Sequence, residues 1–321
     1  MSSLTIGSLF SGIGGLELGL ERAGMKVLWQ SEIDDDARAV LKQHWPDTHC
    51  YEDVRDVKSA KSIDVICGGF PCQDYSDAGR RSGLAGDRGA LWWEMHRVIA
   101  ECRPTWIVGE NVPGLLASNG GMDFGTIISS LVGWDVPTPL GGWGNAGLVQ
   151  GRSDHYGIVY GTLDSQYFGV PQRRRRLFIV GHSGGVARPE ILALSEGLFG
   201  HSAPGTGSWL CPSSEVGQCV EEGGSSQVGP IAFHPTQDPI HGPVSPALGV
   251  TTDGMACLNV TATDNVPRRL TPVECERLQG FPDDWTRYGL DNKLLRKGTR
   301  YQMLGNAVTV NVAEWIGQQI S

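Results

Sequence analysis

Short apolar runs alternate with amphipathic stretches through residues 4–182, and this alternation restricts the possible folds more than any other feature of the sequence. Short runs rich in Val, Ile, Leu and aromatic residues are typical of buried strands, whereas apolar residues spaced three and four apart are typical of helices. Their alternation predicts βαβ units and a doubly wound α/β domain on a parallel sheet. The predicted strands are Leu4–Leu9, Lys26–Ser31, Thr48–Tyr51, Ile63–Cys67, Trp106–Gly109, His155–Leu163 and Leu177–Gly181, and the predicted helices lie near Gly15–Ala23, Asp35–His44, Ala90–Glu101 and Gly125–Val132.

The pattern changes after His182. Residues 183–267 are rich in Gly, Ser, Pro and Thr and contain no long periodic segment, and helical periodicity returns at Thr271–Leu278 and Val308–Ile320. We therefore expect a smaller, irregular, β-rich domain inserted near the end of the first one. The predicted boundaries are 1–182, completed by 301–321, for the α/β domain and 183–300 for the inserted one. The glycine-rich stretch Gly141–Ser153 is predicted to be a surface loop.

Composition excludes several classes of protein. With 40% hydrophobic residues, the chain has no run approaching the roughly 18 apolar residues of a membrane span, and no basic segment followed by an apolar stretch begins it. We expect a cytoplasmic location and no membrane association. The eight cysteines form no CxxC pair, which argues against a zinc site, and we predict no metal. A net charge of −9 does not exclude nucleic acid, because local arginine clusters such as residues 173–176 decide phosphate binding.

A glycine-rich turn, SLFSGIGGLELGL, joins the first predicted strand to the first helix. Such turns let a ligand approach the backbone, although they also join many strands to helices with no ligand. Glu32 follows the second strand, 20 residues after Gly12, at the spacing expected of a carboxylate that binds ribose hydroxyls. Asp53 follows the third strand and could accept a hydrogen bond from an adenine amino group. Because no GxxxxGK[ST] phosphate loop is present, an adenosine-containing cofactor without phosphates fits best.

The next two strands end in groups that carry chemistry. Cys72 follows the fourth strand and Glu110 ends the fifth, so both are expected at the carboxyl edge of the sheet, where ligands bind. From position alone, Cys72 is either a buried thiol or a nucleophile. A thiolate and a neighbouring carboxylic acid suit attack on a cytosine ring, because the acid offsets charge that develops at the ring nitrogen. A cysteine hydrolase would need a histidine base, and the nearest, His96, falls inside a predicted helix.

Seven blocks resemble, in order, the motifs of the DNA (cytosine-5) methyltransferase family of bacterial or phage type. They are SLFSGIGGLELGL, GGFPCQDYSDAG, GDRGALWWEMHRVI, ENVPGL, GVPQRRRRLFIVG, RRLTPVECERLQGFPDDW and YQMLGNAVTVNVAEWIG. The resemblance covers residues 4–182 and 268–317. It implies a Rossmann-like, S-adenosylmethionine-dependent methyltransferase domain with an inserted target-recognition domain, acting on double-stranded DNA.

The resemblance also assigns residues to roles. It implies that Cys72 attacks the base, that Glu110 contacts its Watson–Crick edge, and that Arg176, with Arg174 beside it, completes the catalytic group. The family's Gln-x-Arg-x-Arg pattern places Gln172 with these arginines, at the DNA. The cofactor-binding positions are Phe10, Gly12, Gly14, Glu32, Ile33, Asp53 and Asn306. The loop that closes over flipped DNA includes Gln73, Ser76, Arg80, Arg81 and Arg88.

Two positions depart from the family. Ile33 stands where members often have an aromatic residue stacking on adenine, so adenine would pack on an aliphatic side chain. Ala307 stands where the last block commonly has Ser. Residues 183–267 would read the DNA sequence, with Trp209, Phe233, His234 and Gln237 among the side chains able to contact bases. Thr271 and Glu274 are predicted to form a capping box on the helix that follows.

Two alternatives remain open. One is an RNA cytosine methyltransferase, because one branch of the family methylates transfer RNA, although that branch carries little recognition insert. The other is a catalytically silent DNA-binding member, against which Cys72, Glu110 and the arginines argue. We expect a monomer, either the methylating half of a restriction–modification pair with a separate cognate endonuclease or an orphan or phage enzyme.

Overall fold

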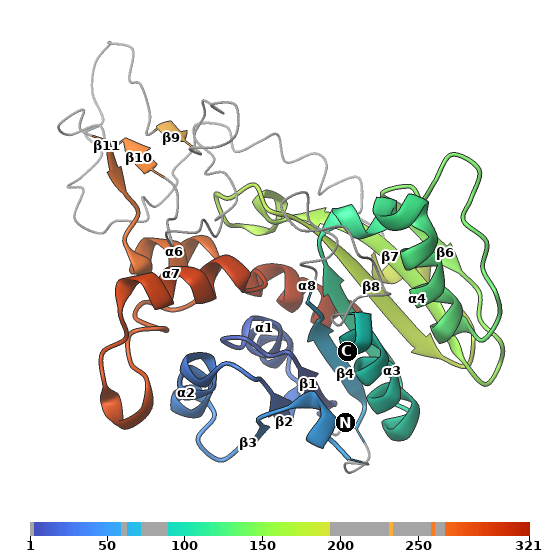
Figure 1. The fold of residues 1–321 in the computed structure, drawn as a ribbon, viewed down its shortest axis with the longest axis horizontal. Helices are drawn as coiled ribbons and strands as arrows, with labels where there is room; N and C mark the ends of the chain where they lie inside the picture. Colours follow the sequence, from blue (N-terminus) through green and yellow to red (C-terminus); the bar gives the residue numbers. More distant parts are fainter. Residues whose placement is uncertain (1–2, 59–62, 72–88, 193–230, 234–257, 261–266) are drawn as a thin grey trace.

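The chain folds around one eight-stranded mixed sheet (Figure 1). The computed structural model describes residues 3–58, 63–71, 89–192, 231–233, 258–260 and 267–321. The strands lie in the order β3, β2, β1, β4, β5, β8, β7, β6. Their bounds in that order are His49–Tyr51, Lys26–Ser31, Thr5–Leu9, Val65–Gly69, Trp106–Asn111, Arg175–Ser183, Tyr156–Asp164 and Ala146–Val149.

The first five strands are parallel, as predicted, and the last three are not. β5 pairs antiparallel with β8, β8 with β7, and β7 with β6. The prediction of an all-parallel sheet was therefore wrong at this edge. Only a short 3-10 turn, Ser165–Phe168, lies between β7 and the approach to β8, and a parallel pair would have needed a long crossover. β6 also falls inside the stretch predicted to be a loop.

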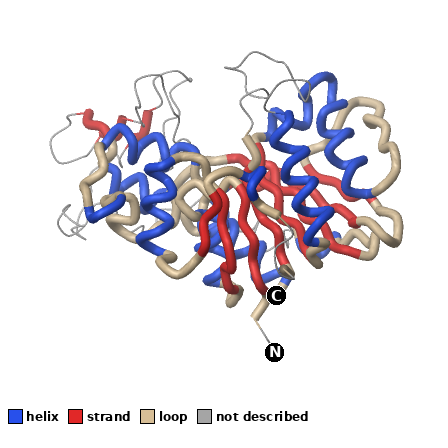
Figure 2. The backbone as a smooth tube through the Cα atoms, turned by 60° about the horizontal axis from the view of Figure 1, so that its bottom comes forward, coloured by secondary structure: helices blue, strands red, loops and turns tan. Residues whose placement is uncertain are grey.

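Helices cover both faces of the sheet (Figure 2). α1 (Gly15–Arg22), α2 (Asp35–His44) and α8 (Val310–Ile320) share one apolar core with one face, while α3 (Gly89–Cys102) and α4 (Met122–Val132) share the second core with the other. The strands alternate accordingly. Val108 belongs to the first core and Ile107 to the second, because successive side chains of a strand point to opposite faces. The predicted doubly wound architecture is confirmed.

The chain order reverses between β1 and β4. From β1 the chain moves outward through β2 and β3, then returns to place β4 on the other side of β1. In open α/β sheets, ligands bind outside the carboxyl ends of the strands at this kind of switch point. The fold therefore predicts a site beyond the ends of β1 and β4, where the residues singled out from the sequence lie.

The C-terminal segment before α8, residues 270–306, lies above α1 and α2 in Figure 1 and shares their apolar core. It contains α6 (Pro272–Leu278) and α7 (Lys297–Asn306), next to a small sheet of β9 (Ile231–Phe233), β10 (Leu258–Val260) and β11 (Pro267–Arg269). The predicted capping box is confirmed: the Thr271 hydroxyl accepts from the Glu274 N–H, and the Glu274 carboxylate accepts from the Thr271 N–H. The pattern did not predict α7. Within the described part of the chain, no helix is long and apolar enough to cross a membrane.

Candidate active site

A cleft of about 670 Å³ opens beyond the carboxyl ends of the parallel strands. Its walls come from the residues that follow β1, β2, β3, β4 and β5, together with the start of β8 and one side of α7. Predicted site residues that line it are Phe10, Gly12, Glu32, Ile33, Asp53, Glu110, Arg174, Arg176 and Asn306. The fold thus brings together, in one cavity, the residues predicted to bind the cofactor, except Gly14, and the described ones predicted to act on the base.

The loop after β1 holds an unusual backbone. Phe10 has φ 54° and Gly12 has φ 55°, and both line the cleft. A positive φ is strained for phenylalanine, and such strain is typical of ligand sites. A Cβ added at Gly12 would meet nothing within 4 Å, so the glycine leaves open space for a ligand against its backbone. Gly14 differs: its Cβ would lie 2.5 Å from Trp45, which makes it a packing position outside the cleft lining.

Glu32 is fixed by the main chain around it. Its carboxylate accepts hydrogen bonds from the N–H groups of Gly12 at 2.6 Å and Asp34 at 2.9 Å. Arg38 donates to the carbonyls of Glu32 and Ile33, which holds the strand end in place. Burial raises the pKa of the Glu32 carboxyl above its ordinary value, and the two backbone hydrogen bonds lower it in part.

The neighbouring positions complete this end of the cleft. The Ile33 side chain is 73% exposed, which leaves an apolar surface free for a flat ring. Asp53 lies just past β3, where its carboxylate caps the 3-10 turn Val54–Asp56 by accepting from the Arg55 N–H at 2.9 Å. Asp53 thus faces the cleft from a fixed position, and Arg55 lines the cleft beside it.

Glu110 lies on β5 beside Gly69 of β4. A Cβ on Gly69 would approach the Glu110 carboxylate to 3.0 Å, so glycine leaves room for this side chain. The Arg176 guanidinium lies 3.2 Å from the carboxylate. Burial raises the pKa of the Glu110 carboxyl, and the charges of Arg176 and Arg174 lower it in part. The arrangement lets Glu110 hold a proton or a charge, depending on what enters the cleft.

The buried side-chain amide of Asn111 connects β5 to the residues that follow β4. Asn111 donates from its side chain to the carbonyl of Phe70 at 3.1 Å and accepts from the Val112 N–H at 2.8 Å. Phe70 and Pro71 line the cleft and immediately precede Cys72. Asn111, the residue after Glu110, therefore holds the main chain two residues before Cys72 in the sequence.

Arg174 and Arg176 are two residues apart and do different things. Arg174 is 1% exposed, and its guanidinium donates to the carbonyls of Gly305 at 2.8 Å and Ala307 at 2.7 Å. These carbonyls flank Asn306, so Arg174 fixes the end of α7 at the cleft. The predicted catalytic role of Arg174 therefore gains a structural component that the sequence did not indicate.

Other predicted residues do not reach the cleft or lie elsewhere. Gln172 is fully buried, which argues against the DNA contact predicted for it. Cys72 and the predicted DNA-contacting residues of the loop lie outside the described residues, as do three of the candidate base-reading residues, and of Phe233 only the strand position is described. Those outside are Cys72, Gln73, Ser76, Arg80, Arg81, Arg88, Trp209, His234 and Gln237.

Several cleft residues were missed by sequence reasoning. The side of α7 that faces the cleft carries Thr299, Gln302 and Met303, with Arg296 at the helix start. The apolar pattern did not predict α7, so the residues on its cleft-facing side could not be chosen from the sequence. Among the residues described, no group of three or more His, Cys, Asp or Glu is placed to hold a metal ion.

The residues present fit an adenosine-containing cofactor. Gly12 leaves a ligand-sized approach to the backbone, Glu32 and Asp53 offer carboxylate oxygens at neighbouring strand ends, and Ile33 offers an apolar surface. The same cleft continues to Glu110 and Arg176. A doubly wound fold with a cleft lined in this way at the ends of its parallel strands is typical of enzymes that bind an adenosine-containing cofactor.

The family follows from comparison with known proteins. The chain matches the C-5 cytosine-specific DNA methylase family over residues 4–138, 145–195 and 233–321, and it belongs to that family. It is 32% identical, over 98% of its length and 74% of the relative's, to the type II methyltransferase M2.BsuMI of Bacillus subtilis (strain 168). It is 29% identical to the type II methyltransferase M.Eco47II of Escherichia coli, over 98% of the chain and 78% of that protein. The predicted family and enzyme class are confirmed.

One similar protein carries a different printed activity. A DNA N-6-adenine-methyltransferase of Escherichia phage P1 is 28% identical over 100% of the chain and 61% of that protein's length. Among solved structures, the fold resembles a putative DNA modification methyltransferase from an E. coli prophage, with TM-score 0.62, 20% identity and coverage of 99% of the chain and 98% of that one. It also resembles S. pombe Dnmt2 methyltransferase, with TM-score 0.62, 16% identity and coverage of 97% and 96%.

Proposed function

We propose that this DNA methylase transfers the methyl group of S-adenosylmethionine to carbon 5 of a cytosine flipped out of duplex DNA, with Cys72 as nucleophile. One observation supports this most strongly. Glu110 and Arg176 form a partly buried ion pair beside Gly69, three residues before Cys72, in the same cleft as the loop after β1. A thiol in this cleft would lie near Glu110, the acid proposed to protonate the cytosine ring, and near the residues proposed to bind the cofactor.

The cofactor end has an assignment for each wall. Glu32 would accept from the ribose hydroxyls, Asp53 from the adenine amino group, and Ile33 would pack on the adenine ring. Gly12 and Asn306 would contact the rest of the S-adenosylmethionine molecule. When bound, S-adenosylmethionine supplies an electrophilic methyl group on a sulfonium.

The protein's own groups would do the remaining chemistry. The Cys72 thiolate adds to carbon 6 and pushes ring electrons toward nitrogen 3. Glu110 gives its proton to nitrogen 3, so that no negative charge builds up on the ring. Carbon 5 then becomes nucleophilic enough to be methylated. Solvent water takes the proton from carbon 5, and the electron pair of that C–H bond forms the double bond to carbon 6 and expels the Cys72 thiolate. The proton on nitrogen 3 returns to Glu110. The raised pKa of Glu110 supports this role, because a buried carboxyl keeps a proton to donate at higher pH than an exposed one.

Arg176 would hold the base and the acid together. Its guanidinium already lies against the Glu110 carboxylate, so one cation can orient the acid and contact the flipped cytosine. Base flipping costs a few kcal/mol of lost stacking, and the loop containing Gln73, Ser76, Arg80, Arg81 and Arg88 would offset this by filling the vacated space.

The domain division and biological setting are part of the same proposal. The sequence predicts a catalytic domain of residues 1–182 with 301–321 and a target-recognition domain of residues 183–300. Because the 300/301 boundary falls inside α7 and Leu270 to Trp285 contribute to the core under α1 and α2, the catalytic domain would instead resume near residue 270. The chain would act as a monomer in the bacterial or phage-infected cytoplasm, in a restriction–modification pair or alone. The similarity to type II methyltransferases of bacteria supports this setting.

A transfer assay tests the proposal. Purified protein is incubated with labelled S-adenosylmethionine and either duplex DNA or transfer RNA, and the modified base is identified by mass spectrometry. We expect 5-methylcytosine in DNA from the wild type and a loss of at least roughly a thousandfold in Cys72→Ser, since serine is a much weaker nucleophile. Cys50→Ser, a partly buried thiol outside the cleft lining, is the matched control.

The base and the polymer decide between the alternatives. Methylation of RNA alone would overturn the assignment of DNA as substrate, and N6-methyladenine in the product DNA would overturn the assignment of cytosine as the modified base. No transfer to any substrate would favour a silent DNA-binding member. A second readout uses DNA containing 5-fluorocytosine, which should trap the Cys72 adduct because fluorine blocks elimination from carbon 5. Methylation of normal DNA without a trapped adduct would contradict attack by Cys72.

A further inference from the structure

Trp285 connects the cofactor loop to the C-terminal segment of the protein. Its side chain is 8% exposed, and its indole N–H donates to the carbonyl of Ile13 at 2.8 Å. Ile13 lies between Gly12, which lines the cleft, and Gly14. A residue near the end of the chain therefore holds the main chain of the loop that follows β1.

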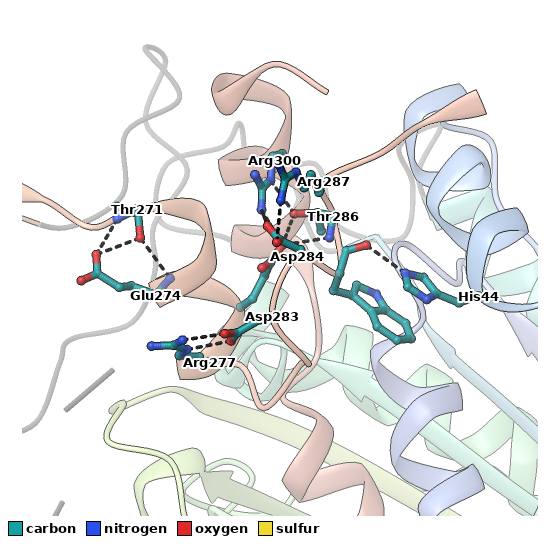
Figure 3. Close-up of polar contacts among 11 residues, drawn as sticks. His44, Thr271, Glu274, Arg277, Asp283, Asp284, Thr286, Arg287 and Arg300 are labelled. Atoms are coloured by element: carbon teal, nitrogen blue, oxygen red, sulfur yellow. Dashed lines mark hydrogen bonds and ion pairs between the residues drawn. The ribbon is translucent and has the colours of Figure 1, made fainter. Parts of the chain in front are cut away.

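Two aromatic residues at the end of α2 hold Trp285 in turn. The His44 ring stacks on the Trp285 ring at 3.4 Å with an interplanar angle of 1°, and its Nε2–H donates to the Trp285 carbonyl at 2.9 Å (Figure 3). Trp45 meets Trp285 edge-on at 5.7 Å and packs against Gly14. Burial lowers the pKa of His44, so the ring is held in the neutral form that stacks without a charge.

The next residue ties the same segment to α7. The N–H and hydroxyl of Thr286 both donate to the Glu276 carboxylate, which is 0% exposed. Arg300 of α7 donates to the same carboxylate and to the Thr286 hydroxyl, each at 2.9 Å (Figure 3). Arg300 lies one residue after Thr299, whose side of α7 lines the cleft. Trp285 and Thr286 thus join the two facing walls of the cleft through consecutive residues.

From this geometry we infer that Trp285 is a positioning residue for cofactor binding, because its indole N–H fixes the 10–14 loop against the segment that carries α7. This inference rests on the proposed function, since it assigns the cleft to S-adenosylmethionine. The physical reason is that a buried carbonyl left without its donor costs free energy, which the loop would relieve by moving. A shifted loop would alter the cofactor end of the cleft and leave Glu110 and Arg176, on β5 and β8, in place.

The test uses a variant that keeps the ring and removes the donor. In Trp285→Phe, we expect the dissociation constant for S-adenosylmethionine, measured by calorimetry, to rise about tenfold, the effect of one lost hydrogen bond to a buried acceptor. KM for the cofactor should rise to match, with kcat at saturating cofactor and KM for DNA unchanged within about twofold. A role in folding alone would not produce this division between KM and kcat.

Trp134→Phe is the matched control. Trp134 also donates its indole N–H to a backbone carbonyl, that of Gln150, at 2.9 Å, but it lies outside the cleft lining. Its cofactor affinity should equal that of the wild type. If Trp285→Phe binds the cofactor as tightly as Trp134→Phe, the inference is wrong. If the wild type itself does not bind S-adenosylmethionine, the proposed function fails first, which is a different result.

A second variant covers the case in which Trp285→Phe does not fold. His44→Leu removes the stacking and the hydrogen bond to the Trp285 carbonyl from a half-buried position at the end of α2. We expect the cofactor dissociation constant to rise about threefold, with kcat unchanged. An unchanged dissociation constant in a folded His44→Leu protein would overturn the inference.

Discussion

Glu32 and Glu110 are two partly buried carboxyl groups in one cleft, and the protein holds them in different ways. Glu32 directly follows β2 and Glu110 lies on β5, and strands β1 and β4 lie between β2 and β5 in the sheet. Burial raises the pKa of both. Glu32 is held by backbone N–H groups of Gly12 and Asp34, whereas Glu110 is held by the side chain of Arg176.

The difference matches two kinds of task. Backbone N–H donors have no side-chain bonds to rotate about, so Glu32 keeps one geometry and is suited to binding the adenosine part of a cofactor, which does not react. A guanidinium on a long side chain can follow a carboxyl as it gains or loses a proton, so Glu110 is suited to chemistry. In the proposed assignment, backbone hydrogen bonds fix the carboxylate at the cofactor end of the cleft. The carboxylate at the catalytic end is held by a side chain that can move with it.

The largest effect should come from the adjustable end. Glu110→Gln keeps the shape and removes the acid, so we expect kcat to fall by about a hundredfold to ten-thousandfold, the usual contribution of a positioned acid. Cofactor affinity should stay the same. Single-turnover methylation measures the first quantity and calorimetry the second. Glu190→Gln, at an exposed carboxylate beside Arg188, is the control and should change neither.

The pH dependence gives this prediction a sign. In the proposed mechanism the protonated Glu110 is the active form. Because its pKa is raised, its contribution should be fully present at low pH and lost as pH rises through the raised value. The wild-type rate should therefore show a loss on the basic side that offsets the gain from Cys72 ionisation. Glu110→Gln should show only the gain. The same falling limb in both proteins would contradict the assignment of the acid to Glu110.

An intermediate effect, on stability, is expected at Arg174, which holds the end of α7 where this helix lines the cleft. Arg174→Met leaves the carbonyls of Gly305 and Ala307 without their charged donor, and the free energy of unfolding should fall by about 3 kcal/mol. Urea denaturation measures this. Arg175→Met, at the exposed neighbouring residue, should cost less than about 0.5 kcal/mol. Equal losses in the two variants would show that α7 does not depend on the buried guanidinium.

The smallest effect should come from the rigid end. Glu32→Gln keeps one acceptor oxygen and sets an NH₂ group against the second backbone N–H, so cofactor affinity should weaken about tenfold while kcat at saturation is unchanged. Calorimetry and steady-state kinetics give the two values. Glu52→Gln, an exposed neighbour outside the cleft lining, should bind normally. A fall in kcat without a change in affinity would reverse the contrast between the two carboxyl groups.

Local patterns were enough for much of the fold and for the cofactor end. The alternation of strands and helices gave the parallel half of the sheet, because periodicity depends on neighbours a few residues apart. The Thr271 capping box was predicted for the same reason, since its two partners are three residues apart. Glu32 and Gly12 were paired by their spacing within one βαβ unit, and the structure joins them by a hydrogen bond.

Contacts between distant segments were beyond such patterns. The antiparallel direction of β7 and β8 depends on how the chain turns, which the apolar pattern of a strand does not record. The run of four arginines looked uniform, yet Arg174 is buried against α7 while Arg176 pairs with Glu110. The helix α7 itself was missed, and with it the wall it forms.

The sequence by itself determined the family, the order of the elements and the chemical groups at the strand ends. These depend on motifs and on periodicity, both of which are local. Only the tertiary structure decided which partner each buried charge received, and hence which carboxyl group is fixed and which is adjustable. The reason is physical: a polar group that leaves water needs a hydrogen-bond or ion-pair partner that is near in space. For Glu110, Arg174 and the Ile13 carbonyl, that partner comes from a distant part of the chain.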